Sequence, residues 1–278
     1  MGASAERPPQ DKPFETVAER PPQDKRQERL ARMVAERGFV RVVDASEELG
    51  VSLVTVRSDL GVLEASGVLR RVHGGAVAID SVEPSFERSL ASSAEEKLLI
   101  AVAAADLVTS GSSVLVDVGS TTAAVARALV ARGDLHDVTV ITNGLSIALE
   151  LEVAIPRFRV VVTGGTLRPL QHSLVAPLAA VVLEQVHVDL AFIGCNGVHA
   201  VEGVTNLNLP EAEVKRAMVA ASTRAVVVAD GSKIGAVQLG RIGPLSAFDT
   251  VITGDTADPD ALAALQAAAG PAVVVVAR

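Results

Sequence analysis

The chain has 278 residues, a formal net charge of −8 and 49% hydrophobic residues, but only 2% aromatic residues. Its single cysteine, Cys195, excludes an internal disulfide framework, and its longest uncharged apolar runs are strand-sized and too short to span a membrane. Such an aliphatic, alanine-rich composition is typical of buried parallel strands covered by small-residue helices. Because no apolar leader follows the N-terminus, we expect a cytoplasmic protein that does not associate with membranes.

The first 24 residues are charged and rich in proline, and the octapeptide AERPPQDK occurs at 5–12 and again at 18–25. Two copies are too few, and too rich in proline, to form a solenoid. A segment of this composition buries too little apolar surface to fold by itself. We therefore predict a disordered leader over residues 1–24.

Two short helices are predicted at the start of a small domain over residues 25–79. Apolar residues at helical spacing indicate a helix over 26–37, with Gly38 at its C-terminus. After the extended link FVRVV, the segment DASEELG predicts a second helix. Asp44 is the expected N-cap of this helix, and Glu47, three residues later, completes a capping box.

A third helix is predicted to begin at Ser52, separated from the second only by a turn around Gly50, which is the spacing of a helix-turn-helix. At 100° per residue this helix has an apolar stripe and a small, polar outer face. The stripe consists of Leu53, Val56, Leu60 and Leu63, and the outer face of Val54, Thr55 and Ser58, with Arg57 at its flank. Such a face fits the major groove of DNA, and the free N–H groups after Ser52 suit a phosphate.

The segments VLRRV and AV on either side of HGG predict a two-stranded wing, whose arginines can approach phosphates or a minor groove. Asp59 is expected to form an ion pair with an arginine of the wing or of the first helix. An ordinary amphipathic helix followed by a hairpin is the alternative interpretation. The candidate DNA-binding residues are Ser52, Thr55, Arg57, Ser58, Arg70, Arg71 and His73.

The charge is unevenly distributed between the two parts of the chain. Residues 25–77 carry nine Lys and Arg against seven Asp and Glu, a net charge of +2. Residues 78–278 carry 13 against 21, a net charge of −8. A mildly basic module attached to an acidic domain is typical of a DNA-reading unit joined to a domain of another kind.

Beyond a predicted linker over 80–93, runs rich in Val and Ile alternate with helical segments throughout residues 94–278. This order predicts an α/β domain with an open, mainly parallel, helix-covered sheet. Ligands of such sheets bind beyond the carboxyl ends of the strands. The strand ends expected at one common edge are 117–120, 142–144, 163–165, 195–197 and 230–233.

Three features of this domain carry candidate chemistry. In DVGSTT, Gly119 permits a tight turn and the hydroxyls of 120–122 lie beside free helix N–H groups, which makes an anion site; a helix cap without a ligand is the alternative. Glu211 and Lys215 are four residues apart on one helix face, where a solvated salt bridge is expected. Lys233 can meet a phosphate as a point charge.

The segment VSLVTVRSDLGVLEASGVLRRVHGGAV resembles the winged-helix signature of the DeoR family of bacterial sugar-metabolism regulators, VS-x-x-T-[IV]-R-R-D-L-x-x-L-E followed by G-x-L-x-R-x-H-G-G-A. DVGSTT, VVTGG, DLAFIGCNGV, GVTNLNLPEAEVKRAM and VVVADGSK are similar to the sensor domain of that family, so the resemblance covers most of residues 26–240. Two positions depart from it: Ser58 replaces the second arginine of R-R-D, and Ala176 stands where relatives often have glycine.

The resemblance implies a transcriptional regulator, a repressor in the first instance, that binds double-stranded operator DNA and needs no cofactor. It implies a sensor domain, over 94–278, related in fold to ribose-5-phosphate isomerase and the CoA transferases, which binds a phosphorylated sugar without converting it. The effector-binding residues that it implies are Asp117, Gly119, Ser120, Thr121, Thr122, Asn143, Gly164, Gly165, Lys215 and Lys233.

The alternative function is a sugar-phosphate isomerase or transferase, with Glu211 or Asp117 as the base and Lys233 as the electrophile. Metal binding is not expected, because the five histidines are scattered and none pairs with another at helical spacing. Operators of helix-turn-helix proteins mirror a two-fold axis, so we expect a homodimer or homotetramer. In the linker, Phe86 is expected to pack as an anchor that helps to couple the two domains.

Overall fold

The computed structural model describes residues 23–37, 39–66, 68–72, 74–78, 83–269 and 273–277. The chain divides into two compact units, residues 1–82 and 83–278, each of which is described by itself. Residues 1–22 of the predicted leader, His73, and residues 80–82 of the predicted linker lie outside the described residues.

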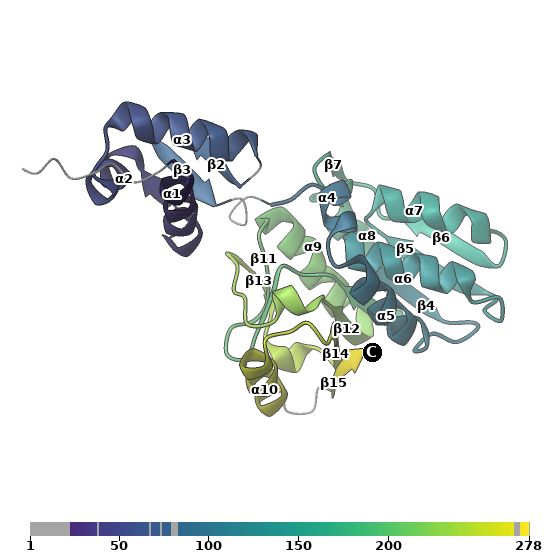
Figure 1. The fold of residues 1–278 in the computed structure, drawn as a ribbon. Helices are drawn as coiled ribbons and strands as arrows, with labels where there is room; N and C mark the ends of the chain where they lie inside the picture. The colour runs from purple at the N-terminus through teal and green to yellow at the C-terminus, as the bar shows by residue number, and fades with distance from the viewer. Residues whose placement is uncertain are drawn as a thin grey trace, which may run out of the picture. The chain divides into compact units, whose positions relative to one another are not determined.

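The first unit packs three helices against a small antiparallel sheet (Figure 1). The helices are α1 (Gln23–Arg37), α2 (Val42–Leu49) and α3 (Leu53–Ala65). The strands, in the order β1-β3-β2, are β1 (Phe39–Arg41), β3 (Gly75–Ala78) and β2 (Leu69–Val72). Leu30, Val56 and Leu60 lie in a common apolar core with Leu69 of the sheet. The predicted helix-turn-helix and wing are therefore confirmed, with β1 as a third strand.

Two local predictions for this unit are wrong. Helix α2 begins at Val42 rather than after Asp44, because Arg41 pairs with Gly75 in the sheet and Val42 is buried immediately behind it. Asp44 thus lies in the first turn of the helix, where it accepts hydrogen bonds of 2.7 and 2.8 Å from Arg41. Leu53, the first residue of α3, is 39% exposed, and the buried stripe includes Asp59 instead.

Asp59 joins the first helix to the third, which confirms its predicted ion pair. Its carboxylate accepts hydrogen bonds from Arg26 at 2.5 and 3.1 Å and from Gln27 at 3.1 Å. Both ionised side chains are largely removed from water, with 10% of Arg26 and 3% of Asp59 exposed. The pair therefore fixes the packing of α1 against the helix that carries the candidate DNA contacts.

We expect Asp59→Ala to lower the free energy of unfolding of the first unit by about 3 kcal/mol, because it removes the buried carboxylate that joins Arg26 and Gln27 of α1 to α3. Asp44→Ala removes an exposed pair and serves as the control, with an expected loss of about 1 kcal/mol or less. Urea titration followed by circular dichroism measures both values. Equal losses in the two variants would contradict the structural role of Asp59.

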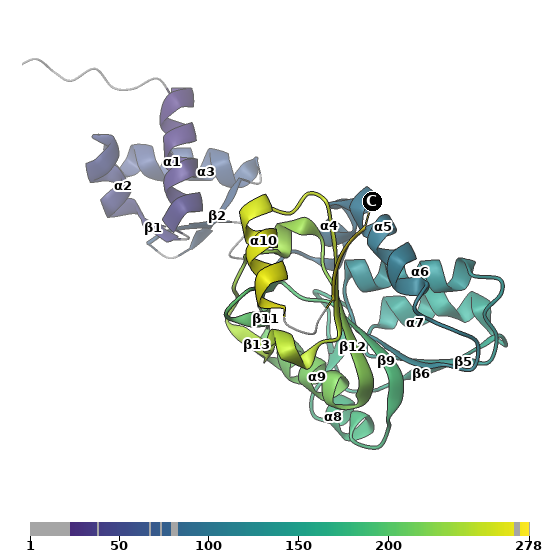
Figure 2. The same cartoon turned by 90° about the horizontal axis from the view of Figure 1, so that it is seen from below.

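The second unit is built on a seven-stranded, wholly parallel sheet in the order β15-β14-β12-β9-β4-β5-β6 (Figures 1 and 2). This topology confirms the predicted α/β fold class. The strands are β4 (Ser113–Val116), β5 (Val138–Thr142), β6 (Phe158–Val162), β9 (Val188–Ile193), β12 (Ser222–Val228), β14 (Thr250–Gly254) and β15 (Val273–Ala277).

Helices cover both faces of this sheet, as Figure 2 shows. One apolar core lies beneath α5 (Ala94–Ala105), α6 (Ser120–Ala131) and α7 (Leu145–Leu151). The other lies beneath α8 (Leu178–Leu183), α9 (Leu209–Ala220) and α10 (Pro259–Ala268). The central strands are buried on both sides, which explains why their sequences are continuous apolar runs rather than alternating ones.

Several elements of this unit lie outside the main sheet and were not predicted. They are the hairpin of β7 (Thr166–Arg168) and β8 (Ser173–Val175), the small sheet of β10 (Gly197–His199), β11 (Gly203–Asn206) and β13 (Gly240–Gly243), the short helix α4 (Phe86–Ala91), and three 3-10 turns over Glu152–Ala154, Gly231–Lys233 and Leu245–Ala247. Phe86 is 4% exposed and belongs to the first of the two cores, as its predicted packing requires. No helix in the described ranges is both long and apolar enough to cross a membrane.

Candidate functional site

The first candidate surface is the N-terminal half of α3. The Ser52 hydroxyl caps the helix by accepting a hydrogen bond of 3.2 Å from the Thr55 N–H, and it lies 2.9 Å from the Thr55 hydroxyl. Ser52 is exposed and Thr55 is partly exposed. Arg57 and Ser58 are exposed, and Val54 between them and the cap is 73% exposed. The helix thus presents a small polar surface beside one cation, which is what the major groove admits.

The wing places a second cation beside α3. A Cβ atom at Gly61 of α3 would lie 3.7 Å from the Arg71 guanidinium, so this side chain lies along the helix. The Arg71 N–H donates to the Glu64 carboxylate at 2.8 Å, which ties β2 to α3. Arg70 lies in β2, but its side chain is not described, and His73 lies outside the described residues.

The second candidate surface is the carboxyl edge of the parallel sheet, where the turns after β4 and β5 meet. Gly119, with φ of 142°, makes the turn from β4 into α6, and its carbonyl accepts a hydrogen bond of 2.9 Å from the Thr122 hydroxyl. Ser120 and Thr121 form the first turn of α6. The N–H groups of this first turn thus lie at the predicted anion site, whereas the Thr122 hydroxyl is buried and used within the turn.

Asn143 holds these turns together rather than facing solvent. It is fully buried; its side-chain oxygen accepts the Val118 N–H at 2.9 Å, and its amide donates to the Leu174 carbonyl at 3.4 Å. Gly165 is required for a close approach, because a Cβ atom there would lie 2.4 Å from the Val175 carbonyl oxygen. Asn143 and the glycine pair Gly164 and Gly165 thus dock the β7–β8 hairpin onto the sheet edge.

Asp117 and Lys215 form a buried ion pair at the centre of this edge. The ammonium of Lys215 contacts the Asp117 carboxylate and donates to the Gly194 carbonyl at 3.1 Å, and the Gly194 N–H donates to the same carboxylate at 3.0 Å. The second oxygen of Asp117 is buried and has no hydrogen-bond partner. Lys215 therefore pairs with Asp117, and the solvated salt bridge expected between Glu211 and Lys215 is wrong, because both residues are 3% exposed.

The electrostatics of this pair follow from its burial. Burial raises the pKa of Asp117 to about 6, although the positive charge of Lys215 opposes the shift. Burial lowers the pKa of Lys215, but the carboxylates of Asp117 and Glu211 outweigh it, so the pKa is raised and the ammonium stays charged. The edge of the sheet thus holds a permanent buried cation next to an orphaned carboxylate oxygen.

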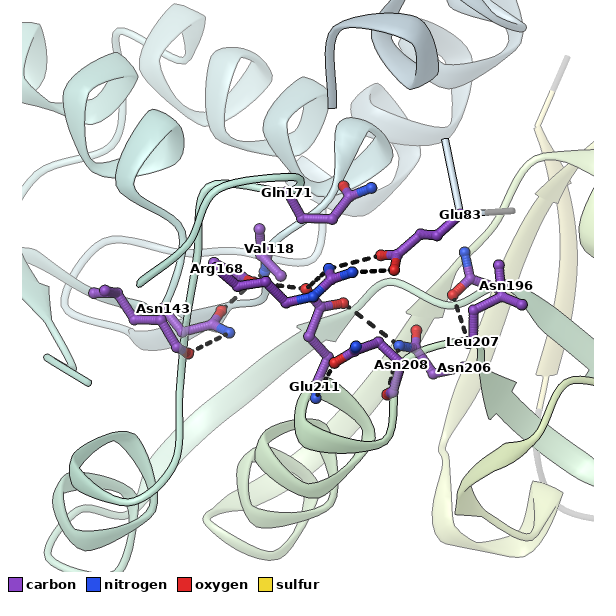
Figure 3. Close-up of polar contacts among 12 residues, drawn as sticks. Glu83, Val118, Asn143, Arg168, Gln171, Asn196, Asn206, Leu207, Asn208 and Glu211 are labelled. Carbon is purple, nitrogen blue, oxygen red and sulfur yellow. Dashed lines mark hydrogen bonds and ion pairs between the residues drawn. The ribbon is translucent and has the colours of Figure 1, made fainter. Parts of the chain in front are cut away.

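Glu211, at the start of α9, belongs to a second ionic group (Figure 3). One of its carboxylate oxygens accepts hydrogen bonds from Arg168 at 2.9 Å and from the Ser173 hydroxyl at 2.6 Å. Its other oxygen accepts the Asn206 amide at 3.4 Å. Arg168 also donates to both carboxylate oxygens of Glu83, so its guanidinium lies between two acidic side chains.

Lys233 lies at the far side of the edge, after β12. It is partly exposed, and its ammonium donates to Ser232 at 3.0 Å. The neighbouring Asp230 is buried and lies 3.8 Å from the ammonium of Lys97, the pKa of which is lowered by burial. Burial also raises the pKa of Cys195 to about 12, which fits a structural thiol. Within the described ranges no group of His, Cys, Asp and Glu has a metal-binding arrangement.

Sequence reasoning missed Arg168, Glu83 and Ser173. Arg168 stands in a short stretch with few apolar residues, and Glu83 stood in a segment predicted to be a linker, so neither gave a periodic signal. The one available sign was the pair of glycines before Arg168, which marks a close turn.

Two family models and several known proteins match most of the length of this chain. The model of the DeoR-like helix-turn-helix domain matches residues 26–82, and the model of the DeoR C-terminal sensor domain matches residues 92–255. The HTH-type transcriptional regulator GolR of Listeria innocua is 34% identical over 82% of this chain and 89% of that protein. The glycerol-3-phosphate regulon repressor of Escherichia coli is 30% identical over 81% and 88%. Among solved structures, ribose 5-phosphate isomerase A of Methanocaldococcus jannaschii is similar over 51% of this chain and 55% of that chain, with 20% identity and a TM-score of 0.36.

Proposed function

This chain belongs to the DeoR family of transcriptional regulators, and we propose that it represses genes of carbohydrate metabolism and that a phosphorylated sugar controls its affinity for operator DNA. The observation that carries this proposal is the combination of an exposed helix-turn-helix with a sheet edge that gathers helix N–H groups, hydroxyls and a buried cation. The first reads DNA and the second binds an anion. The name of the Escherichia coli relative, which includes a phosphorylated polyol, supports the same ligand class.

In this proposal α3 enters the major groove and the wing approaches the phosphates. The proposed DNA contacts are Ser52, Thr55, Arg57, Ser58, Arg70, Arg71 and His73. We assign residues 25–79 to this function and residues 94–278 to the effector. The proposed effector contacts are Asp117, Gly119, Ser120, Thr121, Thr122, Asn143, Gly164, Gly165, Lys215 and Lys233, of which Asp117, Asn143 and Lys215 shape the site from beneath.

The proposal is tested by fluorescence anisotropy with labelled DNA from upstream of the protein's own gene. We expect nanomolar binding at low salt, weakened by one or more members of a panel of sugar phosphates and unaffected by the corresponding free sugars. Failure to bind that DNA at low salt would overturn the regulator, and an affinity that no sugar phosphate changes would overturn the effector.

We further propose that the sheet edge binds its ligand without converting it. The alternative enzyme would use Asp117 or Glu211 as its base. The Asp117 carboxylate is fully buried and neutralised by Lys215. The Glu211 carboxylate is buried and accepts three hydrogen bonds, one of them from Arg168. A general base must be within reach of the proton that it removes. Incubation with sugar phosphates in tritiated water is expected to leave their carbon-bound positions unlabelled, and incorporation of tritium would favour the enzyme.

Ser58 gives a prediction for the DNA surface. It is exposed on the outer face of α3, where the family signature has an arginine. Ser58→Arg is expected to tighten DNA binding about 10-fold at 100 mM salt and to steepen the dependence of log K on log [salt] by about one unit, because one phosphate contact is added. Anisotropy titrations at four salt concentrations measure the slope, with Ser66→Arg at the exposed end of α3 as the control. A slope that is the same in wild type and Ser58→Arg would contradict the assignment of this face.

Because a helix-turn-helix reads two-fold symmetric operators, we propose that the protein acts as a homodimer or homotetramer in the cytoplasm. Sedimentation velocity with and without a palindromic operator measures the assembly. A monomer bound to one half-site at saturation would contradict it.

A further inference from the structure

The hairpin β7–β8 holds the first residues of the second unit in place. Arg168 of this hairpin binds both carboxylate oxygens of Glu83, the first residue of the unit. The Gln171 amide donates to the Pro84 carbonyl at 2.5 Å, and the Phe86 N–H donates to the Leu170 carbonyl at 2.9 Å. Residues 83–86 are thus attached to the hairpin by one ion pair and two hydrogen bonds to the backbone.

The same arginine also belongs to the sheet-edge site. Its guanidinium donates to Glu211 at 2.9 Å, and Glu211 stands one helical turn before Lys215 on α9. The ionic groups joined here are three carboxylates, Glu83, Glu211 and Asp117, against two cations. One carboxylate is therefore in excess before any ligand arrives, and an added phosphate would increase that excess unless an acidic side chain left.

Glu83 is the carboxylate that can leave at the smallest cost. Its side chain is 11% exposed, against 4% for Glu211 and 0% for Asp117. Glu211 keeps hydrogen bonds from Ser173 and Asn206 if Arg168 turns away, and Asp117 keeps Lys215. Burial raises the pKa of Glu83, and the hydrogen bonds from Arg168 oppose the shift.

We propose that Arg168 is an anion-binding residue of the sheet-edge site and that Glu83 is its internal competitor, so that a bound phosphate takes over the guanidinium and releases residues 83–86 from the hairpin. The planar guanidinium binds a phosphate and a carboxylate with the same two-pronged geometry, so one can replace the other. This inference rests on the proposed function and adds its regulation. Residues 83–86 continue the chain that leads from the DNA-binding unit, so their release changes the connection through which a ligand acts.

The inference is tested on the full chain with inorganic phosphate as the probe and isothermal titration calorimetry as the measurement. Glu83→Gln removes the competitor and is expected to bind phosphate at least threefold more tightly than wild type. Arg168→Gln is expected to bind it at least 10-fold more weakly. Glu95→Gln makes the same change of charge at an exposed position of α5 and is expected to match wild type.

Hydrogen exchange at the Phe86 amide gives a second readout, because this N–H donates to the Leu170 carbonyl of the hairpin when residues 83–86 are attached to it. In wild type we expect saturating phosphate to accelerate its exchange, whereas in Glu83→Gln exchange should already be faster than in phosphate-free wild type and should change little when phosphate is added. Circular dichroism identifies any variant that fails to fold. If Arg168→Gln fails to fold, the comparison of Glu83→Gln with wild type alone tests whether Glu83 competes with phosphate.

The outcomes separate the inference from the function on which it rests. Equal phosphate affinity in wild type and Glu83→Gln overturns the competition, while phosphate-dependent DNA binding in the same preparations leaves the proposed function standing. Phosphate binding with no change in Phe86 exchange overturns the release. If no variant binds phosphate or any sugar phosphate, both the inference and the effector part of the function are wrong.

Discussion

Replacing Lys215 with methionine is expected to lower the free energy of unfolding of the second unit by about 3–5 kcal/mol. The ammonium is 3% exposed and neutralises Asp117, which is fully buried. Methionine fills a similar volume but supplies no charge, so the carboxylate would remain in the core with only the Gly194 N–H as a hydrogen-bond donor. Because it leaves a buried charge without compensation, removing one partner lowers the free energy of unfolding by more than the ion pair contributes to it.

The loss in Lys215→Met should depend on pH in a defined direction. The pKa of Asp117 in the folded protein is about 6, above its ordinary value, and removing Lys215 raises it further. A raised folded-state pKa means that protonation favours the folded state, so stability falls as pH rises through that pKa. The variant should therefore be less destabilised at pH 5 than at pH 8.

Urea titrations at the two pH values measure this effect by circular dichroism, since the chain has neither Trp nor Tyr to report by fluorescence. Lys233→Met is the matched control, because this lysine is partly exposed and its ammonium contacts only a serine in the described structure. Its expected loss is about 0.5 kcal/mol or less. A loss of that size in Lys215→Met, or one that does not change with pH, would show that the buried pair is not ionic.

Arg57→Ala is expected to weaken operator binding about 10- to 100-fold without changing the stability of the protein. Arg57 is exposed near the N-terminus of α3, beside the small polar face formed by Thr55 and Ser58. An arginine at this place in a helix-turn-helix reaches a base edge or a phosphate, and a two-pronged contact to a guanine is worth about 1–3 kcal/mol. Because this side chain is exposed, its removal leaves no cavity, and the free energy of unfolding should not change.

The nature of the Arg57 contact follows from a comparison of two DNA duplexes. A base contact is lost only on the operator, whereas a phosphate contact is lost equally on an unrelated duplex and lowers the salt slope by about one. Arg32→Ala, which removes an exposed arginine from α1 of the same unit, is the control and should change affinity less than threefold. An operator affinity of Arg57→Ala within twofold of wild type would mean that α3 does not enter the groove as proposed.

The fold class followed from local patterns, because these patterns report burial directly. Continuous apolar runs such as that of β9 occur where a strand is covered on both faces, and the alternation with helices fixes a parallel sheet. The helix-turn-helix was equally visible, since Ser52 and Gly50 mark its turn by the backbone conformations that they favour. The start of α2 was misplaced because pairing of β1 with β3, a contact distant in sequence, outweighed the local capping signal of Asp44.

The sequence predicts the turns of the candidate site but not its ion pairs. The turns at Gly119, Asn143 and Gly165 could be placed at one edge, because the carboxyl ends of parallel strands meet there. Which charges pair across that edge could not be predicted, because Asp117 and Lys215 are 98 residues apart and α9 had offered a nearer partner in Glu211.

By itself, the sequence determined that the protein contains a winged helix-turn-helix and a parallel α/β domain. It also determined the family and the residues of the turns at the sheet edge, since each of these depends on patterns within short segments of the chain. Only the tertiary structure decided which charged side chains pair with one another. It buried Lys215 with Asp117 and set Arg168 between Glu83 and Glu211, because ionic partners are chosen by which elements pack together and how much water they exclude.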